Sequence, residues 1–107
     1  MIVIIPKLLG KSFNALTIYP FIILKNKSLK YDSILLNHEH IHIKQQKELY
    51  WIFFFIWYFI EYVIKLVYFK NSYDAYKNIS FEREAYSNEL NPDYLTNRKK
   101  FNFLKYL

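Results

Sequence analysis

The stretch DSILLNHEHIHIKQQKE, residues 32–48, decides how the rest of this 107-residue chain is interpreted. It holds all three histidines of the protein, within the pattern H-E-x-x-H. Asp32 or Ser33 is a suitable N-cap, and the stretch contains neither glycine nor proline. The sequence therefore predicts a helix over residues 32–48, on which His38 and His42 lie one turn apart on the same face.

Two imidazoles at this spacing can hold one metal ion between them. Positions i and i+4 bring Cβ atoms within about 5–6 Å, so His38 and His42 can both reach a Zn²⁺ ion at about 2.0–2.1 Å. Glu39 is rotated off that line and is the candidate catalytic base, which takes a proton from the attacking water. His40 points away from the shared face, and we expect His40 and Gln45 to line the site rather than to bind metal.

The same pattern has a simpler interpretation, because short motifs also occur by chance. A helix with a polar, solvated face would place the histidines in water, and an H-x-H pattern there would bind transition metals only adventitiously. Every histidine of the chain lies within five residues of sequence, in a segment with helix signals. This concentration favours the metal site.

A catalytic zinc site usually has three protein ligands. No histidine remains for the third position and the chain has no cysteine, so the third ligand must be a carboxylate. The segment ISFEREAY, residues 79–86, predicts the start of a helix with Ser80 as its N-cap. It presents two glutamates in its first turn, Glu82 and Glu84, and both are candidate ligands.

The two motifs together resemble the gluzincins, in which an H-E-x-x-H helix is followed by a second helix that supplies a glutamate ligand. The second motif of many members, Glu-x-x-Ala, matches residues 82–85. The resemblance implies that Glu82 is the third ligand and leaves Glu84 as the runner-up. Tyr86 stands where the family often has an acidic residue or asparagine, so the partner of the histidines is unassigned and Tyr86 is a further candidate to line the site. The chain also resembles small membrane-associated, metallopeptidase-like proteins of Bacteroidetes.

Residues 49–69, LYWIFFFIWYFIEYVIKLVYF, are the second strong feature of the chain. As a helix this run is about 31 Å long, close to the thickness of a bilayer core, and its tryptophans and tyrosines favour the membrane interface. Glu61 and Lys65 interrupt the run and are predicted to form an i,i+4 ion pair. A buried core helix is the alternative, but a chain of 107 residues cannot enclose a helix that is aromatic all round. We therefore expect this helix to be membrane-associated and to contact membrane lipid.

The metal site restricts how this helix meets a membrane. A straight crossing would separate the histidines from Glu82 by about 30 Å and prevent them from sharing an ion. Three successive helices, at residues 32–47, 50–69 and 72–88, would bring the ligands to nearly the same height. No glycine or proline marks the first turn between these helices, and a continuous helix over residues 32–69 would contradict the arrangement.

The N-terminal third is rich in residues that favour β-strands. Residues 1–5, 16–19 and 21–24 are short strand-like runs, interrupted by Pro6 and Pro20. In gluzincin-like enzymes an edge strand beside the metal helix pairs with the extended substrate. The resemblance assigns this role to residues 21–24.

Length and charge set the remaining limits. The length fits a single domain, and the absence of cysteine excludes a disulfide framework and a thiolate metal site. The formal net charge of +6 suits an anionic membrane surface, but the lysines are scattered and form no recognition motif, so we expect no specific nucleic-acid partner. Basic segments flank the apolar run and indicate an inner-membrane location with the site facing the cytoplasm.

The sequence predicts a mainly α fold with a small N-terminal β element, a zincin-like minimal core of about three helices with an apolar membrane-associated helix. The predicted function is zinc-dependent hydrolysis of peptide bonds in peptide or protein substrates, at or near a membrane. The alternative is a non-catalytic membrane subunit that docks on a larger membrane complex and keeps a structural or vestigial metal site. The single domain, residues 1–107, divides into a β-rich segment, the H-E-x-x-H helix, the apolar helix, a glutamate helix and a C-terminal tail, at residues 1–31, 32–48, 49–70, 72–90 and 91–107.

Overall fold

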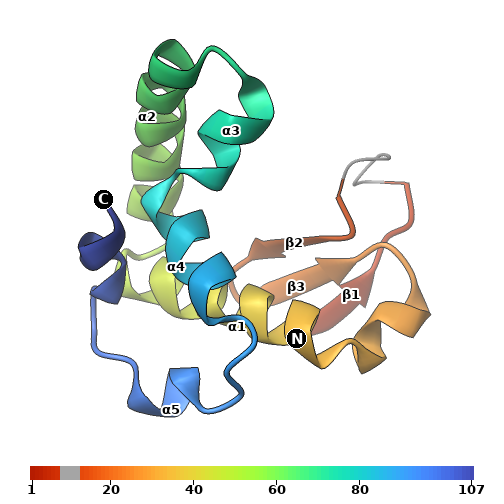
Figure 1. The fold of residues 1–107 in the computed structure, drawn as a ribbon. Helices are drawn as coiled ribbons and strands as arrows, with labels where there is room; N and C mark the ends of the chain where they lie inside the picture. The colour runs from red at the N-terminus through yellow and green to blue at the C-terminus, as the bar shows by residue number, and fades with distance from the viewer. Residues whose placement is uncertain (8–12) are drawn as a thin grey trace.

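The computed structural model describes residues 1–7 and 13–107, and within them a small N-terminal sheet precedes a mainly helical body (Figure 1). This confirms the predicted class, mainly α with a small N-terminal β element. The elements, in chain order, are β1 (Ile2–Ile4), β2 (Ala15–Ile18), β3 (Phe21–Leu24), the 3₁₀ helix η1 (Lys27–Tyr31), α1 (Ser33–Glu48), α2 (Ile52–Phe69), α3 (Ser72–Lys77), α4 (Ser80–Asn88), α5 (Tyr94–Asn97) and the 3₁₀ helix η2 (Asn102–Tyr106).

β3 lies in the centre of the sheet, parallel to β1 and antiparallel to β2. The prediction that residues 21–24 form a substrate-pairing edge strand is therefore wrong, because both edges of β3 are already hydrogen-bonded to neighbouring strands. β2 is the edge strand that contacts α1. The side-chain amide of Gln46 joins them, since it donates to the Thr17 carbonyl oxygen at 2.8 Å and accepts from the Tyr19 amide at 2.6 Å.

α1 begins where its capping signal predicts. The Asp32 carboxylate accepts a hydrogen bond from the Leu35 amide at 3.0 Å, so Asp32 is the N-cap. The helix buries an unusual number of polar side chains, namely His38, Glu39, His42, Gln45 and Gln46. Burying polar groups is costly unless they are paired, so this face of α1 requires polar partners on the elements packed against it.

Three residues separate α1 from α2, and two of them have a positive φ. Tyr50 and Trp51 have φ values of 53° and 45°, although neither is glycine. This conformation costs roughly 1–2 kcal/mol for each L-residue. The Trp51 amide offsets part of that cost by donating to the Gln46 carbonyl oxygen at 2.6 Å. The chain therefore turns here, and a continuous helix over residues 32–69 does not form.

The predicted glutamate helix, residues 72–90, is in fact two helices. α3 ends at Lys77, and the side chain of its C-cap residue, Asn78, donates to the Asp74 carbonyl oxygen at 2.8 Å. Ile79 is then extended, with φ −65° and ψ 136°, before α4 starts. Ile79 occupies the N-cap position, and the predicted N-cap, Ser80, is the first helical residue.

The start of α4 is fixed by a glutamate from α2. The Glu61 carboxylate accepts from the Ser80 amide at 2.6 Å and from the Ser80 hydroxyl at 2.7 Å. It also accepts from the Trp57 indole at 3.0 Å. A carboxylate at a helix N-terminus satisfies a free amide and opposes the helix dipole. The buried Glu61 therefore stabilises α4 instead of forming the predicted ion pair with Lys65.

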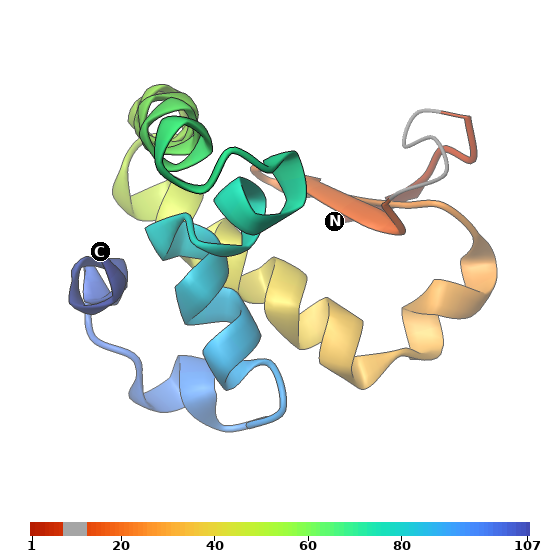
Figure 2. The same cartoon turned by 45° about the horizontal axis from the view of Figure 1, so that its top comes forward.

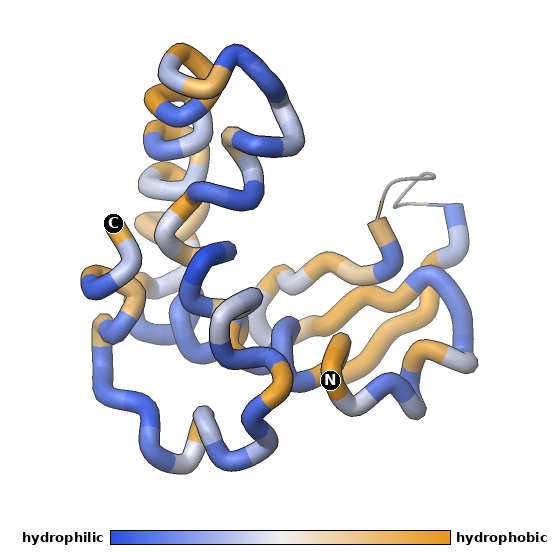
Figure 3. The backbone as a smooth tube through the Cα atoms, viewed as in Figure 1, coloured by the Kyte–Doolittle hydropathy of each residue, from blue (hydrophilic) through white to orange (hydrophobic). Residues whose placement is uncertain are grey.

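One cluster of the apolar core lies where α2, α4 and η2 meet, around Phe54, Ile79, Phe81 and Phe103. Most of α2 lies outside it, because only Phe54 and Glu61 of this helix are buried. α3 lies alongside α2 in both views of the fold (Figures 1 and 2). Figure 3 shows apolar segments along α2. By length and composition α2 is apolar enough to cross a membrane, and it is the one such helix among the described residues.

Candidate metal centre

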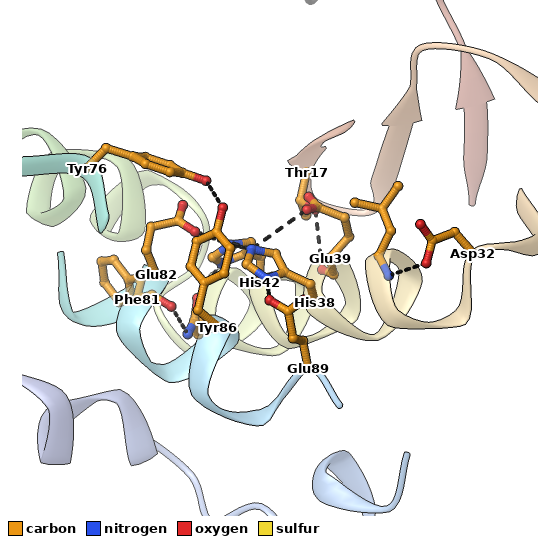
Figure 4. Close-up of polar contacts among 12 residues, drawn as sticks. Thr17, Asp32, His38, Glu39, His42, Tyr76, Phe81, Glu82, Tyr86 and Glu89 are labelled. Atoms are coloured by element: carbon orange, nitrogen blue, oxygen red, sulfur yellow. Dashed lines mark hydrogen bonds and ion pairs between the residues drawn. The ribbon is translucent and has the colours of Figure 1, made fainter. Parts of the chain in front are cut away.

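Three side-chain atoms from two helices converge on one point (Figure 4). The Nε2 atoms of His38 and His42 are 3.2 Å apart, and Glu82 Oε1 lies 3.3 Å from the first and 3.1 Å from the second. All three side chains are buried. The histidines lie one turn apart on α1, and Glu82 lies in the first turn of α4, which packs against α1. The fold thus brings together the three residues that the sequence proposes as ligands.

Hydrogen bonds on the far side of each ring turn both Nε2 atoms toward this point. His38 Nδ1 is 3.3 Å from Glu89 Oε1, and His42 Nδ1 is 2.7 Å from Gln45 Oε1. The Gln45 oxygen acts as the acceptor, because the amide nitrogen of that side chain donates to two oxygens of α4, at 3.1 and 2.9 Å. Both Nδ1 atoms are therefore held as donors, so each ring presents its Nε2 lone pair to the centre when it is in the neutral form.

The centre concentrates electron-rich atoms and therefore attracts positive charge. Burial alone would lower the pKa of His42, but the Glu82 carboxylate outweighs burial and raises that pKa to about 9. Burial would likewise raise the pKa of Glu82, but the two imidazoles hold it well below its ordinary range. Without a metal ion, the chain balances the Glu82 carboxylate by protonating an imidazole. A metal ion that binds here displaces that proton.

The spacing of the three atoms is compatible with a small metal ion. Ligand atoms about 2.0–2.1 Å from a tetrahedral ion lie roughly 3.4 Å from one another. The three separations in the centre are 3.2, 3.3 and 3.1 Å. Two imidazole nitrogens and one carboxylate oxygen are also a donor set used by catalytic zinc sites. The residues present therefore fit zinc both in spacing and in chemistry.

Glu39 lies beside the three atoms. Its Oε2 is 3.9 Å from His38 Nε2, and one ligand atom each of His38, Glu39 and His42 lie within 4.8 Å of one another. The Thr17 hydroxyl of β2 donates to Glu39 Oε1 at 2.7 Å and fixes the carboxylate (Figure 4). One oxygen is thus held while the other faces the centre. This is a suitable geometry for a general base.

Glu84, the runner-up ligand, is held by a different set of partners. Its Oε2 accepts from Arg98 Nε at 2.5 Å and from the Tyr94 hydroxyl at 2.6 Å. Its Oε1 accepts from Gln45 at 2.9 Å. Arg98 also donates to Glu48 Oε2 at 2.6 Å. We call Glu48, Glu84 and Arg98 the arginine network. Glu84 therefore supports the glutamine that orients the second histidine, and its carboxylate oxygens are bonded to that support.

The remaining predicted site-lining residues take different positions. Gln45 is fully buried and holds one of the two imidazoles. The Tyr86 ring meets the His38 ring edge to face, with centroids 4.4 Å apart, and its hydroxyl is 2.8 Å from the Tyr76 hydroxyl. His40 is exposed on α1 and is not part of the buried group.

Two further partners of the ligands are not assigned by the sequence. Glu89, which holds His38 Nδ1, follows Glu82 by seven residues. Seven residues are about two helical turns, and this spacing is the signal that could have identified Glu89. Tyr58 of α2 donates to Glu82 Oε2 at 2.8 Å. Nothing local distinguishes Tyr58 from the other tyrosines, of which the chain has eleven.

A cavity of about 840 Å³ opens beside the centre. Its polar side is formed by Thr17, His38, Glu39, His42, Gln46 and Glu82. The other side is formed by aromatic residues, most of them from α2 and α3. A volume of this size falls within the range of small-molecule sites.

No protein-family model, curated protein or solved structure matches this chain. The chain itself offers a buried centre of two histidines and one glutamate, a second glutamate fixed beside it, and an adjoining cavity. These three features are what a proposal of function has to explain.

Proposed function

We propose that the protein is a zinc-dependent hydrolase of peptide bonds. The observation that carries the proposal is the convergence of His38 Nε2, His42 Nε2 and Glu82 Oε1 beside a cavity. Catalytic zinc sites combine three protein ligands with an open fourth position, whereas structural zinc sites are closed by four. Zinc held by these residues would supply Lewis acidity, which lowers the pKa of water and polarises a carbonyl group.

Glu39 is the general base in this proposal. Thr17 holds one of its oxygens, and the other is free to accept a proton from a water molecule in the cavity. The carboxyl group can then return that proton to the leaving amine. Tyr58 and Glu89 hold the ligand side chains in place, which keeps the distances to the substrate constant.

The outer edge of β2 supports the binding of an extended peptide. The Asn14 carbonyl accepts from the Lys25 amide and so faces β3, and hydrogen-bonding direction alternates along an antiparallel strand. The backbone groups of Ala15 and Thr17 therefore face away from β3. Gln46 uses the Thr17 carbonyl oxygen, which leaves the backbone groups of Ala15 directed outward. A peptide strand paired with Ala15 would run along the cavity that Ala15 and Thr17 line.

Zinc content and hydrolysis together test the proposal. Wild-type protein reconstituted with zinc should hold one ion per chain, measured by elemental analysis, and should cleave a mixed peptide library. His42→Ala and Glu82→Ala should lose the zinc. Glu39→Gln should keep the zinc and lose at least about 100-fold in hydrolysis rate, because a general base contributes about 10²–10⁴-fold.

His40→Ala is the matched control. His40 belongs to the same motif but is exposed, so its loss should leave zinc content and hydrolysis unchanged. Zinc bound by the wild type without hydrolysis of any peptide would overturn the enzyme and favour a structural metal site. Failure of the wild type to bind zinc would overturn the proposal altogether.

We further propose that α2 attaches the protein to a membrane, with the centre on the cytoplasmic side. Residues spaced three and four apart share one face of a helix. On one face of α2, five apolar residues at this spacing are each more than half exposed. We call them the outer stripe of α2: Phe53, Ile56, Ile60, Ile64 and Val67. The net charge of +6 adds attraction to an anionic lipid surface.

Flotation with lipid vesicles tests the membrane proposal. Wild-type protein should float with vesicles that contain anionic lipid. Ile60→Glu, in the middle of the outer stripe, should weaken this binding roughly tenfold or more, because a charge would have to enter the lipid. Leu104→Glu replaces an exposed leucine of η2 and is the control. Protein that stays away from vesicles but copurifies with a defined membrane complex would favour docking on a larger partner.

A further inference from the structure

Aromatic rings form most of the wall of the cavity opposite the centre. α3 contributes Tyr73 and Tyr76. α2 contributes five aromatic residues, Phe54, Phe55, Tyr58, Phe59 and Tyr62. Aromatic side chains bring large apolar surfaces that recognise other apolar groups by stacking and edge-to-face contact.

This aromatic wall begins at the centre itself. The Phe54 ring centroid lies 6.2 Å from that of His42 and 5.2 Å from that of Phe55. Tyr58 reaches the centre directly through its hydrogen bond to Glu82. A group held against the wall therefore lies next to the atoms that would carry out hydrolysis.

The cavity offers a ligand apolar surface and, among the described lining residues, no counter-charge for an anion. Among the described residues that line the cavity, the carboxylates are Glu39 and Glu82, which belong to the centre, and there is no lysine or arginine. The hydroxyls of Tyr58 and Tyr76 are bonded already, to Glu82 and to Tyr86. An anionic side chain entering the cavity would lose its hydration and meet two carboxylates but no cationic side chain, whereas an apolar one would release water from the rings.

We propose that the cavity selects peptides that carry a bulky apolar side chain, such as phenylalanine or leucine, next to the bond to be cleaved. The side chain would lie against Phe55 and Phe59, which are 37% and 62% exposed. Binding would cover this exposed ring surface. The inference names the substrate class of the centre and so rests on the proposed hydrolytic function, but selective binding of apolar peptides is measurable without hydrolysis.

α2 provides a matched control for this selectivity. Phe53 and Phe59 are residues of the same type on the same helix, and they are 59% and 62% exposed. Phe59 lines the cavity, whereas Phe53 lines a separate apolar groove together with Ile60 and Leu107. Phe59→Ala and Phe53→Ala therefore remove similar amounts of exposed apolar surface, but of the two residues only Phe59 lines the cavity.

Cleavage of matched peptides is the first measurement. Three peptides that differ only in one side chain next to the scissile bond, phenylalanine, alanine or glutamate, are compared by kcat/KM. The phenylalanine peptide should be cleaved roughly tenfold or more faster than the alanine peptide, since a few methylene groups give about that discrimination. The glutamate peptide should be the slowest. Phe59→Ala should lower kcat/KM for the phenylalanine peptide toward the value for the alanine peptide. Phe53→Ala should leave the ratio of the two kcat/KM values unchanged.

Binding to an inactive protein separates this inference from the proposed function. Zinc-loaded Glu39→Gln is titrated against the fluorescently labelled phenylalanine and glutamate peptides, and anisotropy reports binding. The phenylalanine peptide should bind at least tenfold more tightly than the glutamate peptide. Phe59→Ala should abolish this difference in affinity, and Phe53→Ala should leave it unchanged.

Each outcome separates the two claims. Cleavage without preference among the peptides, or a preference that Phe53→Ala reduces as much as Phe59→Ala, overturns the inference and leaves the hydrolase. Selective binding that depends on Phe59, without cleavage by the wild type, supports the cavity as an apolar-peptide site and overturns the hydrolase. A protein that neither cleaves the peptides nor binds them selectively would overturn both the hydrolase and the inference.

Discussion

The metal centre and the arginine network are two clusters of buried charged groups on either side of Gln45, and they balance their charge differently. In the network, Arg98 lies between two carboxylates, at 2.5 Å from Glu84 and 2.6 Å from Glu48. In the centre, Glu82 faces two imidazoles whose other nitrogens are already bonded. Arg98 supplies the network with a permanent positive charge, whereas the centre needs a proton or a metal ion. Burial of acidic groups alone therefore does not distinguish the two clusters; the presence of a permanently charged partner does.

A short piece of helix serves both clusters. Each residue of an α-helix turns the chain by about 100°, so Glu82 and Glu84 point about 200° apart on α4. One carboxylate faces the histidines of α1, and the other faces Arg98. Their different roles follow from what is packed on each side of α4, and not from any difference between the two side chains.

Removal of Arg98 should give the largest effect of any change that tests this comparison. Arg98→Met leaves two carboxylates, one of them fully buried, without their cation. Breaking a buried ion pair from one side costs about 3–5 kcal/mol of unfolding free energy. Urea denaturation of the metal-free protein measures this loss.

Arg83→Met is the control for that measurement. Arg83 is exposed on α4 and donates to the carbonyl oxygen of Tyr106 near the end of the chain. Its loss should cost less than about 1 kcal/mol, as for other surface charges. Equal losses in the two variants would mean that the arginine network does not depend on burial and would remove the contrast with the centre.

Gln45 connects the two clusters, and its replacement should weaken metal binding by a smaller amount. Gln45→Met keeps the length of the side chain but removes the acceptor that holds the His42 Nδ1 proton. Loss of such an outer partner typically lowers metal affinity about 10–100-fold, which corresponds to about 1.4–2.7 kcal/mol. Competition with a zinc chelator measures the affinity.

Gln46→Met is a close control, because Gln46 is the next residue and is equally buried but bonds to β2. It should leave the zinc affinity within about threefold of the wild type. A loss of affinity as large as that of Gln45→Met would show that packing of α1, and not the orientation of the imidazole, determines the affinity.

Local signals predicted the parts of the structure that depend on local interactions. Asp32 caps α1 as its sequence indicates, and the H-E-x-x-H spacing places both imidazoles on one face. The turn between α1 and α2 was required by the proposed metal site but not by any local signal. It is made by Tyr50 and Trp51, which adopt a conformation that their own preferences oppose.

The parts that were missed depend on contacts between distant segments. Strand order cannot be read from the strands themselves, and β3 proved to be central. The glutamate helix divides because Glu61, from another helix, binds the Ser80 amide and starts α4 there. The choice between Glu82 and Glu84 stayed open in the sequence because Arg98, which engages Glu84, lies fourteen residues further along the chain.

The dependence of the unfolding free energy on acidic pH should show the smallest of these effects, and it tests whether Arg98 keeps Glu84 ionised. Burial would raise the pKa of Glu84, but hydrogen bonds from Arg98, Tyr94 and Gln45 outweigh it and lower that pKa. The unfolded chain, in which glutamate titrates near pH ~4.3, therefore takes up this proton first as the pH falls. The stability that Glu84 contributes is present above that pH and is lost as the pH falls through the lower folded pKa, by at most about 1.4 kcal/mol per pH unit.

Glu84→Gln should flatten the dependence of the urea midpoint on pH in this window, whereas the surface variant Asp93→Asn should retain it. An unchanged slope in Glu84→Gln would mean that Arg98 does not hold Glu84 in its ionised form, because a carboxylate stabilised by a guanidinium must resist protonation more strongly in the folded chain than in the unfolded one.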